Sequence, residues 1–255
     1  MKKDVKIRSG KNNLSATIFS PASPNQKLAI LLPGFLDSKD YPHLVKLGEE
    51  LSEKGYTVVS FNPTGTWDSE GDISEYSMKQ YLIDISEVIN YMKSQGSFSK
   101  IFLAGHSFGA QVPIVYAATH PEISGIASIM PGRNIGITYP KEVIDEWKKE
   151  GQRESKRDLP NKPDEYISFT VPFSFIEQRL TYHSEEYAKK LTTPALYIAG
   201  EFDELHPVYD VKEIYDVTPD PKKFIILKNE GHDYRKNDAS IQKVNSYVLD
   251  LFEKL

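Results

Sequence analysis

Short apolar runs alternate along the chain with longer stretches in which apolar residues recur every three or four positions. The runs are bounded by glycine, proline or asparagine, which is typical of strands covered on both faces of a parallel sheet. Two earlier runs, VKIRS and LSATIFS, predict a pair of strands joined by a turn at residues 10–13. The later runs are LAILLPGF, YTVVSFN, KIFLAGHS, GIASIMP, ALYIAGE and KFIILKN.

The stretches between these runs have helical periodicity. In residues 77–93 seven apolar side chains share one face, and Ser77 with Gln80 fits a capping box at the helix start. Similar stripes occupy residues 44–51 and 241–255. Strands and helices that alternate in this way predict an α/β fold with right-handed crossovers, a mostly parallel sheet of about eight strands and helices on both faces.

Residues 133–190 interrupt the alternation. They contain a charge-mixed stretch, KEVIDEWKKEGQRESKR, which predicts a solvent-exposed helix, then two prolines and the aromatic stretch ISFTVPFSF. An excursion of this length inside a compact domain is typical of a lid or binding segment. We therefore expect a core at residues 1–132, a cap at 133–190 and the rest of the core at 191–255. The aromatic side chains of the cap either form its own small core or line a ligand pocket.

Composition narrows the possible functions. A chain of 255 residues with 39% hydrophobic content is long enough to bury one sizeable core. The net charge is -5 and the basic residues are scattered among acids, so nucleic acid is not an expected partner. The absence of cysteine excludes disulfides, thiolate zinc sites and a thiol nucleophile. No window reaches the length of a membrane span, and the default expectation is a cytoplasmic protein.

The pentapeptide GHSFG, residues 105–109, lies where a predicted strand passes into a helical pattern. A serine hydroxyl becomes an effective nucleophile only with an exposed position, a base beside it and donors for the developing oxyanion. A sharp strand-to-helix turn provides the exposure, but it requires small residues two positions before and after the serine. Gly105 and Gly109 meet that requirement, so we predict Ser107 to be a nucleophile at the N-terminus of a helix.

The expected base is His232, in KNEGHDY, because it follows the last apolar run and Gly231 lets the loop turn. His206 is its rival, since it also follows the end of a strand. An acid is needed to orient the imidazole, and Asp203 is the preferred candidate because it lies a few residues beyond a strand. The neighbouring acids Glu201, Glu204 and Asp210 stay as alternatives.

The chain order serine, acid, histidine and the G-x-S-x-G turn resemble the α/β-hydrolase superfamily. The resemblance extends from LAILLPGF to KNEGHDY, nearly the whole chain. Within the superfamily the chain is similar to the lidded serine esterases grouped with feruloyl and cinnamoyl esterases and monoacylglycerol lipases. LLPGFLDS, FNPTGTWDSEGD and the excursion after Pro131 carry that similarity. It implies an α/β-hydrolase fold with a cap after the sixth strand.

The chain also departs from the pattern of these esterases. Pro33 stands where they often have histidine, Asn62 replaces a leading aspartate, and Trp67 replaces a small residue. The residues that form the oxyanion hole are implied by the resemblance alone. They are the backbone amides of Phe35 and Phe108.

The resemblance implies hydrolysis of a small carboxylic ester, aryl or of short to medium acyl length, through an acyl-enzyme and without a metal or organic cofactor. Trp67 either packs or narrows the acyl pocket, and Phe169 and Phe173 are candidate substrate contacts from the cap. The same three catalytic groups also suit amide, peptide or thioester hydrolysis. A ligand-binding protein on the same scaffold, a partner-binding cap helix and a homodimer are further hypotheses.

Overall fold

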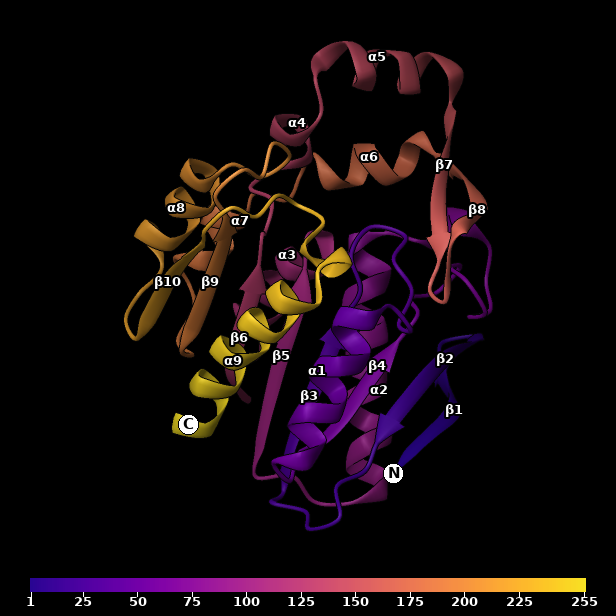
Figure 1. Cartoon of the computed structure of the whole chain (residues 1–255). Coiled ribbons are helices and arrows are strands. Elements are labelled where there is room, and N and C mark those ends of the chain that lie inside the picture. The colour runs from indigo at the N-terminus through magenta and orange to yellow at the C-terminus, as the bar shows by residue number, and fades with distance from the viewer.

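The computed structural model describes residues 1–255 and centres on an eight-stranded sheet (Figure 1). The strand order is β1-β2-β4-β3-β5-β6-β9-β10. β1 and β2 pair antiparallel, β2 is antiparallel to β4, and all the other neighbours are parallel. The strands are β1 Lys2–Ser9, β2 Asn12–Phe19, β3 Lys27–Leu32, β4 Thr57–Phe61, β5 Lys100–His106, β6 Ile123–Ile129, β9 Ala195–Gly200 and β10 Lys222–Leu227.

Helices cover both faces of the sheet. α1 and α9 pack together on one face, and α2, α3 and α8 lie on the other (Figure 1). The predicted mostly parallel α/β fold is confirmed. No helix combines the length and apolar character needed to span a membrane. The helices outside the segment between β6 and β9 are α1 Pro42–Glu53, η1 Ile73–Glu75, α2 Met78–Gln95, α3 Phe108–Ala117, α8 Val208–Val217, η2 Tyr234–Lys236 and α9 Asp238–Lys254.

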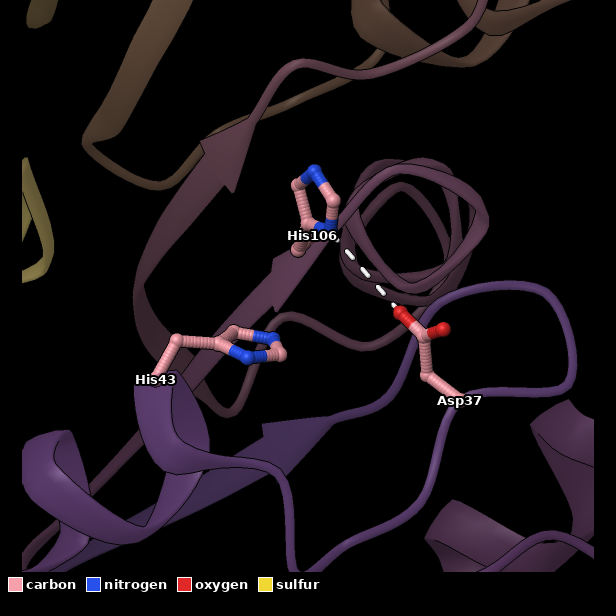
Figure 2. A group of neighbouring side chains, drawn as sticks. All are labelled: Asp37, His43 and His106. Atoms are coloured by element: carbon pink, nitrogen blue, oxygen red, sulfur yellow. Dashed lines mark ion pairs between the residues drawn. The ribbon is translucent and has the colours of Figure 1, made fainter. Parts of the chain in front are cut away.

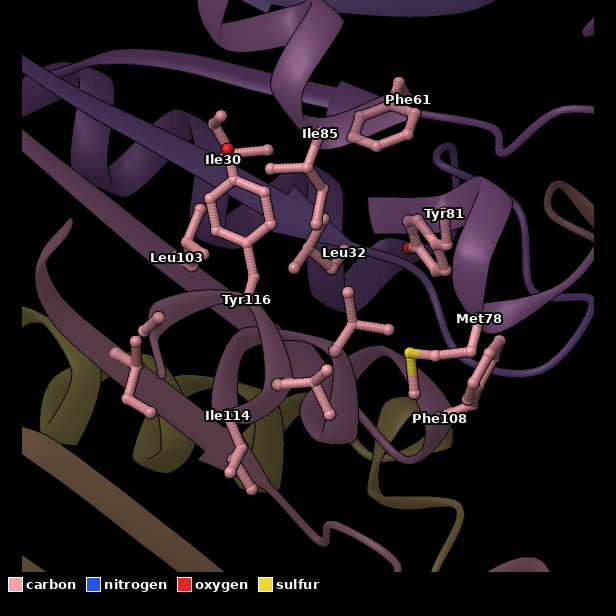
Figure 3. Close-up of a cluster of buried hydrophobic side chains, with 14 of the residues drawn as sticks. Ile30, Leu32, Phe61, Met78, Tyr81, Ile85, Leu103, Phe108, Ile114 and Tyr116 are labelled. Carbon is pink, nitrogen blue, oxygen red and sulfur yellow. The ribbon is translucent and has the colours of Figure 1, made fainter. Parts of the chain in front are cut away.

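Two apolar cores arise because successive side chains of a strand point to opposite faces. In β3, Ile30 and Leu32 enter the core under α2 and α3, while Ala29 and Leu31 enter the core under α1 and α9. Figure 3 shows the first core, where side chains of α2 and α3 meet those of β3 and β5. A strand buried on both faces must be apolar at every position, and this requirement explains the continuous apolar runs of the sequence.

α2 begins after Ser77 as its sequence predicts, but only half of the predicted capping box forms, because the Gln80 side chain donates to Asp84 at 2.9 Å instead. The Ser77 hydroxyl accepts a hydrogen bond from the Gln80 amide at 3.1 Å, so it caps a donor that the first turn leaves free. The predicted apolar face of this helix is buried, with Tyr81 and Ile85 fully inaccessible. α2 is therefore fixed against the sheet, and the Tyr81 hydroxyl reaches the Pro33 carbonyl at 3.0 Å in the loop after β3.

The segment between β6 and β9 extends beyond the carboxyl ends of the strands, at the top of Figure 1. We call residues 133–190 the inserted segment. β7 and β8 pair antiparallel as a separate two-stranded sheet. The elements of the segment are α4 Ile135–Thr138, α5 Lys141–Glu150, β7 Gln152–Leu159, β8 Lys162–Pro172, α6 Phe173–Arg179 and α7 Ser184–Ala188.

The prediction of one charged helix over residues 141–157 is wrong beyond Glu150. α5 stops because Gly151 adopts a left-handed backbone with φ of 72°, a conformation that glycine accepts without strain. The following residues form β7, whose hydrogen-bond partner β8 lies further along the chain. The helix prediction failed because strand pairing is a long-range interaction that local charge patterning does not report.

Candidate active site

Ser107 lies at the turn between β5 and α3 with φ of 57° and ψ of -121°. This left-handed backbone is strained for a residue with a side chain, and its amide is held by the Ile129 carbonyl at 2.9 Å. A methyl group on Gly105 would overlap the Gly109 carbonyl, and one on Gly109 would overlap the Leu32 and Pro33 carbonyls. The two glycines are therefore required by the close approach of three backbone segments.

Three of the predicted side chains form one continuous chain of hydrogen bonds. His232 Nε2 lies 2.9 Å from Ser107 Oγ, and His232 Nδ1 lies 2.8 Å from Asp203 Oδ2. Because the carboxylate is an acceptor, the bonds are consistent with a proton on Nδ1 and with the serine hydroxyl donating to Nε2. The Asp203 side chain is fully buried, and that of His232 is 14% exposed.

Asp203 is held by its own loop. Its Oδ1 accepts the amides of Leu205 and His206, each at 2.9 Å. Burial alone would raise the pKa of Asp203, but the hydrogen bond and charge of His232, together with the His206 amide, keep that pKa below its usual value. The carboxyl group is therefore ionised at neutral pH.

The competing acids point elsewhere. Glu201 accepts bonds from the Lys228 ammonium at 2.7 Å and from the Asn229 amide at 2.9 Å. Asp210 lies 3.4 Å from Arg133, and Glu204 is exposed. Among these acids, only Asp203 contacts His232.

The competing histidine, His206, does not contact Ser107. Its Nδ1 lies 2.7 Å from the Met130 carbonyl, and its ring meets that of His232 edge to face at 4.9 Å. Burial lowers the pKa of His206 to about 3, so its imidazole is neutral and Nδ1–H donates to the carbonyl. His206 thus packs beside His232 and its amide supports the loop of Asp203.

Phe35 and Phe108, whose amides are the predicted oxyanion donors, line the same cavity as Ser107. Phe108 is the first residue of α3, where helix geometry leaves the amide without an intrahelical acceptor. Phe35 follows the end of β3, and its carbonyl accepts two bonds from Arg157 of β7, from Nε at 2.9 Å and from Nη2 at 2.7 Å. The inserted segment therefore holds the peptide loop that carries the Phe35 amide.

A cavity of about 340 Å³ opens over this group. Ser107, His232, Phe35 and Phe108 line it, together with residues of the inserted segment.

The three predicted substrate contacts are not among the residues that line this cavity. Trp67 donates its Nε1–H to the Leu36 carbonyl at 2.9 Å and packs edge to face on Phe169, which is buried. Phe173 is partly buried against the same core. These aromatic side chains join the inserted segment to the sheet.

Asp37, His43 and His106 form a buried cluster of metal-ligating side chains beneath the elbow (Figure 2). Their donor atoms lie within 4.8 Å of one another. Asp37 lies 3.9 Å from His106 Nδ1 and 3.6 Å from Arg157 Nε, so its charge already faces a guanidinium. Burial lowers the pKa of His43 to about 3 and leaves it neutral. We interpret the cluster as packing that supports β5, because it has no free negative charge to balance a divalent cation.

A second group of similar composition consists of Asp203, His206 and His232. Its side chains are already hydrogen-bonded, because His232 binds Asp203 and His206 binds the Met130 carbonyl.

The sequence did not predict the roles of Arg157 and Arg179, two arginines of the inserted segment that line the cavity. Arg157 lies in the stretch that was predicted to be helical, and Arg179 follows the aromatic stretch without a local motif. Both reach the site through tertiary packing, for which the local sequence carries no signal.

Residues 28–164 match the α/β-hydrolase fold family, and the chain belongs to that family. It is 24% identical over 230 residues to the rat (Rattus norvegicus) mitochondrial palmitoyl-protein thioesterase ABHD10, covering 89% of this chain and 75% of the relative.

Two solved structures share the fold. One is Est1E from Butyrivibrio proteoclasticus with ferulic acid bound, with a TM-score of 0.74, 20% identity and coverage of 96% of this chain and 98% of that one. The other is α/β-hydrolase domain-containing protein 10 from mouse, with a TM-score of 0.75, 21% identity and coverage of 99% of each chain.

Proposed function

We propose that the protein is a serine hydrolase that cleaves carboxylic esters through an acyl-enzyme. The observation that carries the proposal is the hydrogen-bonded series Ser107, His232 and Asp203 at a strained strand-to-helix turn. Membership of the α/β-hydrolase family supports hydrolase chemistry in general. The ester and the roles of the individual residues are our inference from the geometry.

In the first step His232 Nε2 takes the proton of Ser107 as its Oγ attacks the ester carbonyl carbon. Asp203 stabilises the imidazolium that forms and holds its orientation. The proton passes to the leaving alcohol as the carbon–oxygen bond breaks, which leaves an acyl group on Ser107. A water molecule then attacks that acyl group, again with His232 as base, and the acid is released.

The Phe35 and Phe108 amides are the proposed donors to the tetrahedral oxyanion. The N-terminus of α3 adds a favourable field for negative charge at the same position. Because Arg157 binds the Phe35 carbonyl, it positions the loop that carries the Phe35 amide.

The volume of the cavity and the name of the rat relative suggest two substrate classes. A cavity of about 340 Å³ suits an aryl or short-to-medium acyl group. A thioester is the second candidate, because the rat relative is named a palmitoyl-protein thioesterase and the same three groups cleave both bond types. We keep a cytoplasmic location and a homodimer as predictions, to be checked by fractionation and by light scattering.

The test is a hydrolysis panel of p-nitrophenyl esters, acyl thioesters and aminoacyl anilides, run on the wild type and on Ser107→Ala. We expect ester turnover that falls by at least about 10³-fold in the variant, while the unfolding temperature stays close to that of the wild type. Equal turnover in the two proteins would overturn the assignment of Ser107. Faster turnover of anilides than of esters would favour a peptidase.

A further inference from the structure

Arg179, the last residue of α6, is a buried cation in the wall of the catalytic cavity. Its side chain is 5% exposed, and no carboxylate lies within ion-pair distance of it. The guanidinium donates one hydrogen bond, from Nη2 to Gln111 Oε1 at 3.1 Å, and Nε has no partner. A guanidinium has five N–H donors, so most of this one's hydrogen-bonding capacity is unused.

The other cations that line the cavity are already balanced or face solvent. Arg235 makes two bonds to Asp158, at 2.8 and 2.9 Å, and Lys236 pairs with Asp233 at 2.8 Å. Arg157 faces Asp37 and holds the Phe35 carbonyl. Lys156 is 66% exposed and lies near Glu154. Arg179 is thus the one buried cation of the cavity wall whose charge no acid balances.

Arg179 and Ser107 line the same cavity. Its guanidinium carbon is 4.1 Å from the centre of the Phe108 ring, and Phe108 is the residue that follows Ser107. The aromatic face offsets part of the cost of burial. Burial still lowers the pKa of Arg179 to about 10, which leaves the group charged at neutral pH. An unbalanced buried charge is unfavourable, and an anion in the cavity would remove that penalty.

We propose that Arg179 binds a carboxylate carried by the substrate, so that the enzyme prefers esters or thioesters whose acyl or alcohol part is anionic. The inference rests on the proposed function and names the substrate class of the same site. A single guanidinium balances one negative charge, which matches a carboxylate rather than a phosphate dianion. The chain as a whole carries a net charge of -5, so its overall field opposes this preference and a local group must produce it.

The first test compares matched substrates on the wild type. One pair places the charge in the acyl group, p-nitrophenyl glutarate against p-nitrophenyl pentanoate. The other places it in the alcohol, 4-carboxyphenyl butanoate against 4-carbamoylphenyl butanoate. We expect kcat/KM to be about 10- to 100-fold higher for the anionic member of one pair, the range of a hydrogen bond to a charged group. That pair also tells which side of the ester lies beside Arg179. A preference for the neutral member in both pairs would overturn the proposal.

Variants then assign the preference to its residue. Arg179→Gln should lower kcat/KM for the favoured anionic ester by about 10- to 100-fold and change the neutral ester by less than about threefold. Arg179→Lys should retain part of the preference because it keeps the charge. The matched control is Lys149→Gln, which removes one exposed charge of the inserted segment outside the cavity lining and should alter the preference by less than about threefold. Equal losses on both esters in Arg179→Gln would contradict the proposal.

Binding separates this proposal from the hydrolase assignment. In Ser107→Ala, the anionic member of one of the two substrate pairs should bind more tightly than its neutral partner in calorimetry, and the added Arg179→Gln substitution should remove the difference. If no ester is hydrolysed yet this difference is found, the carboxylate site stands and the hydrolase assignment fails. If esters are hydrolysed but the two members of each pair bind alike, the carboxylate site is wrong and the hydrolase assignment stands.

Discussion

At the scale of single residues, Ser107 is held in a conformation that it would not adopt alone. Its φ of 57° is maintained because the turn is closed by the Ile129 carbonyl on one side and by the start of α3 on the other. Backbone strain of this kind persists only where the surrounding structure enforces it. The result is a hydroxyl that points out of the sheet toward His232.

We predict that Asp203→Asn lowers kcat for the best ester by about 10³- to 10⁴-fold. An amide carries no charge to stabilise the imidazolium, and its NH2 group can favour the wrong imidazole tautomer. Glu204→Gln is the matched control, because Glu204 is an exposed acid on the same loop, and it should change kcat by less than about threefold. A loss below tenfold in Asp203→Asn would show that Asp203 does not orient the base.

Ser107, Asp203 and His232 lie together because each follows a strand whose carboxyl end lies at the same edge of the sheet, and the sequence pattern shows those strand ends. The sequence pattern alone does not show which of the two histidines, His232 or His206, contacts Ser107. The difference depends on the Met130 carbonyl, which accepts a hydrogen bond from His206 Nδ1–H. That contact joins residues 76 positions apart, so no local pattern could have shown it.

At the scale of elements, the hairpin of β7 and β8 anchors the inserted segment over the site. Asp158 forms the two-bond ion pair with Arg235, and its carbonyl accepts the Tyr41 hydroxyl at 2.8 Å. The neighbouring Arg157 holds the Phe35 carbonyl. The hairpin therefore sets the position of a peptide loop that we place in the oxyanion hole.

Arg157→Gln should lower kcat by about 10- to 100-fold with a smaller change in KM. The variant would displace the Phe35 amide, whose hydrogen bond to the oxyanion stabilises the transition state more than the bound substrate. Arg153→Gln is its control on the same strand, since Arg153 packs over the Trp147 ring away from the Phe35 loop. Steady-state kinetics on both variants provide the measurement. A rise in KM with kcat unchanged would mean that Arg157 acts in substrate binding instead.

The hairpin is also the element that sequence reasoning missed. Most residues of β7 are polar and at least partly exposed, so the strand lacks the alternation of a half-buried strand. Its stability comes from pairing with β8 and from the anchors to the core, and both are tertiary contacts. The core strands were predictable for the opposite reason, because burial on both faces leaves a continuous apolar run.

At the scale of the whole molecule, burial of neutral histidines links stability to pH. His43 is 1% exposed, both of its ring nitrogens lack partners, and its ring packs edge to face on those of His106 and Tyr234, each at 5.6 Å. Burial lowers its pKa from 6.5 to about 3. Between about pH 6.5 and pH 3, His43 therefore carries a proton in the unfolded chain but not in the folded chain.

Because the folded pKa of His43 is depressed, its contribution to stability is complete above pH 6.5 and is lost as the pH falls toward 3. Between pH 8 and pH 5 the free energy of unfolding should fall by about 2 kcal/mol through this group alone. His43→Phe keeps an aromatic ring at the position but removes the proton site. Urea unfolding at pH 8 and pH 5 should show that the free energy of unfolding falls by about 2 kcal/mol less in His43→Phe than in the wild type. Equal drops in both proteins would contradict the link.

The central claim is that Ser107 is an activated nucleophile. Intact-mass labelling with a fluorophosphonate probe, on the wild type, Ser107→Ala and His232→Ala, tests it most directly. We predict one adduct on the wild type, none on Ser107→Ala and labelling slowed by at least about 10²-fold in His232→Ala. An adduct that persists in folded Ser107→Ala, or no adduct on the folded wild type, would contradict the account.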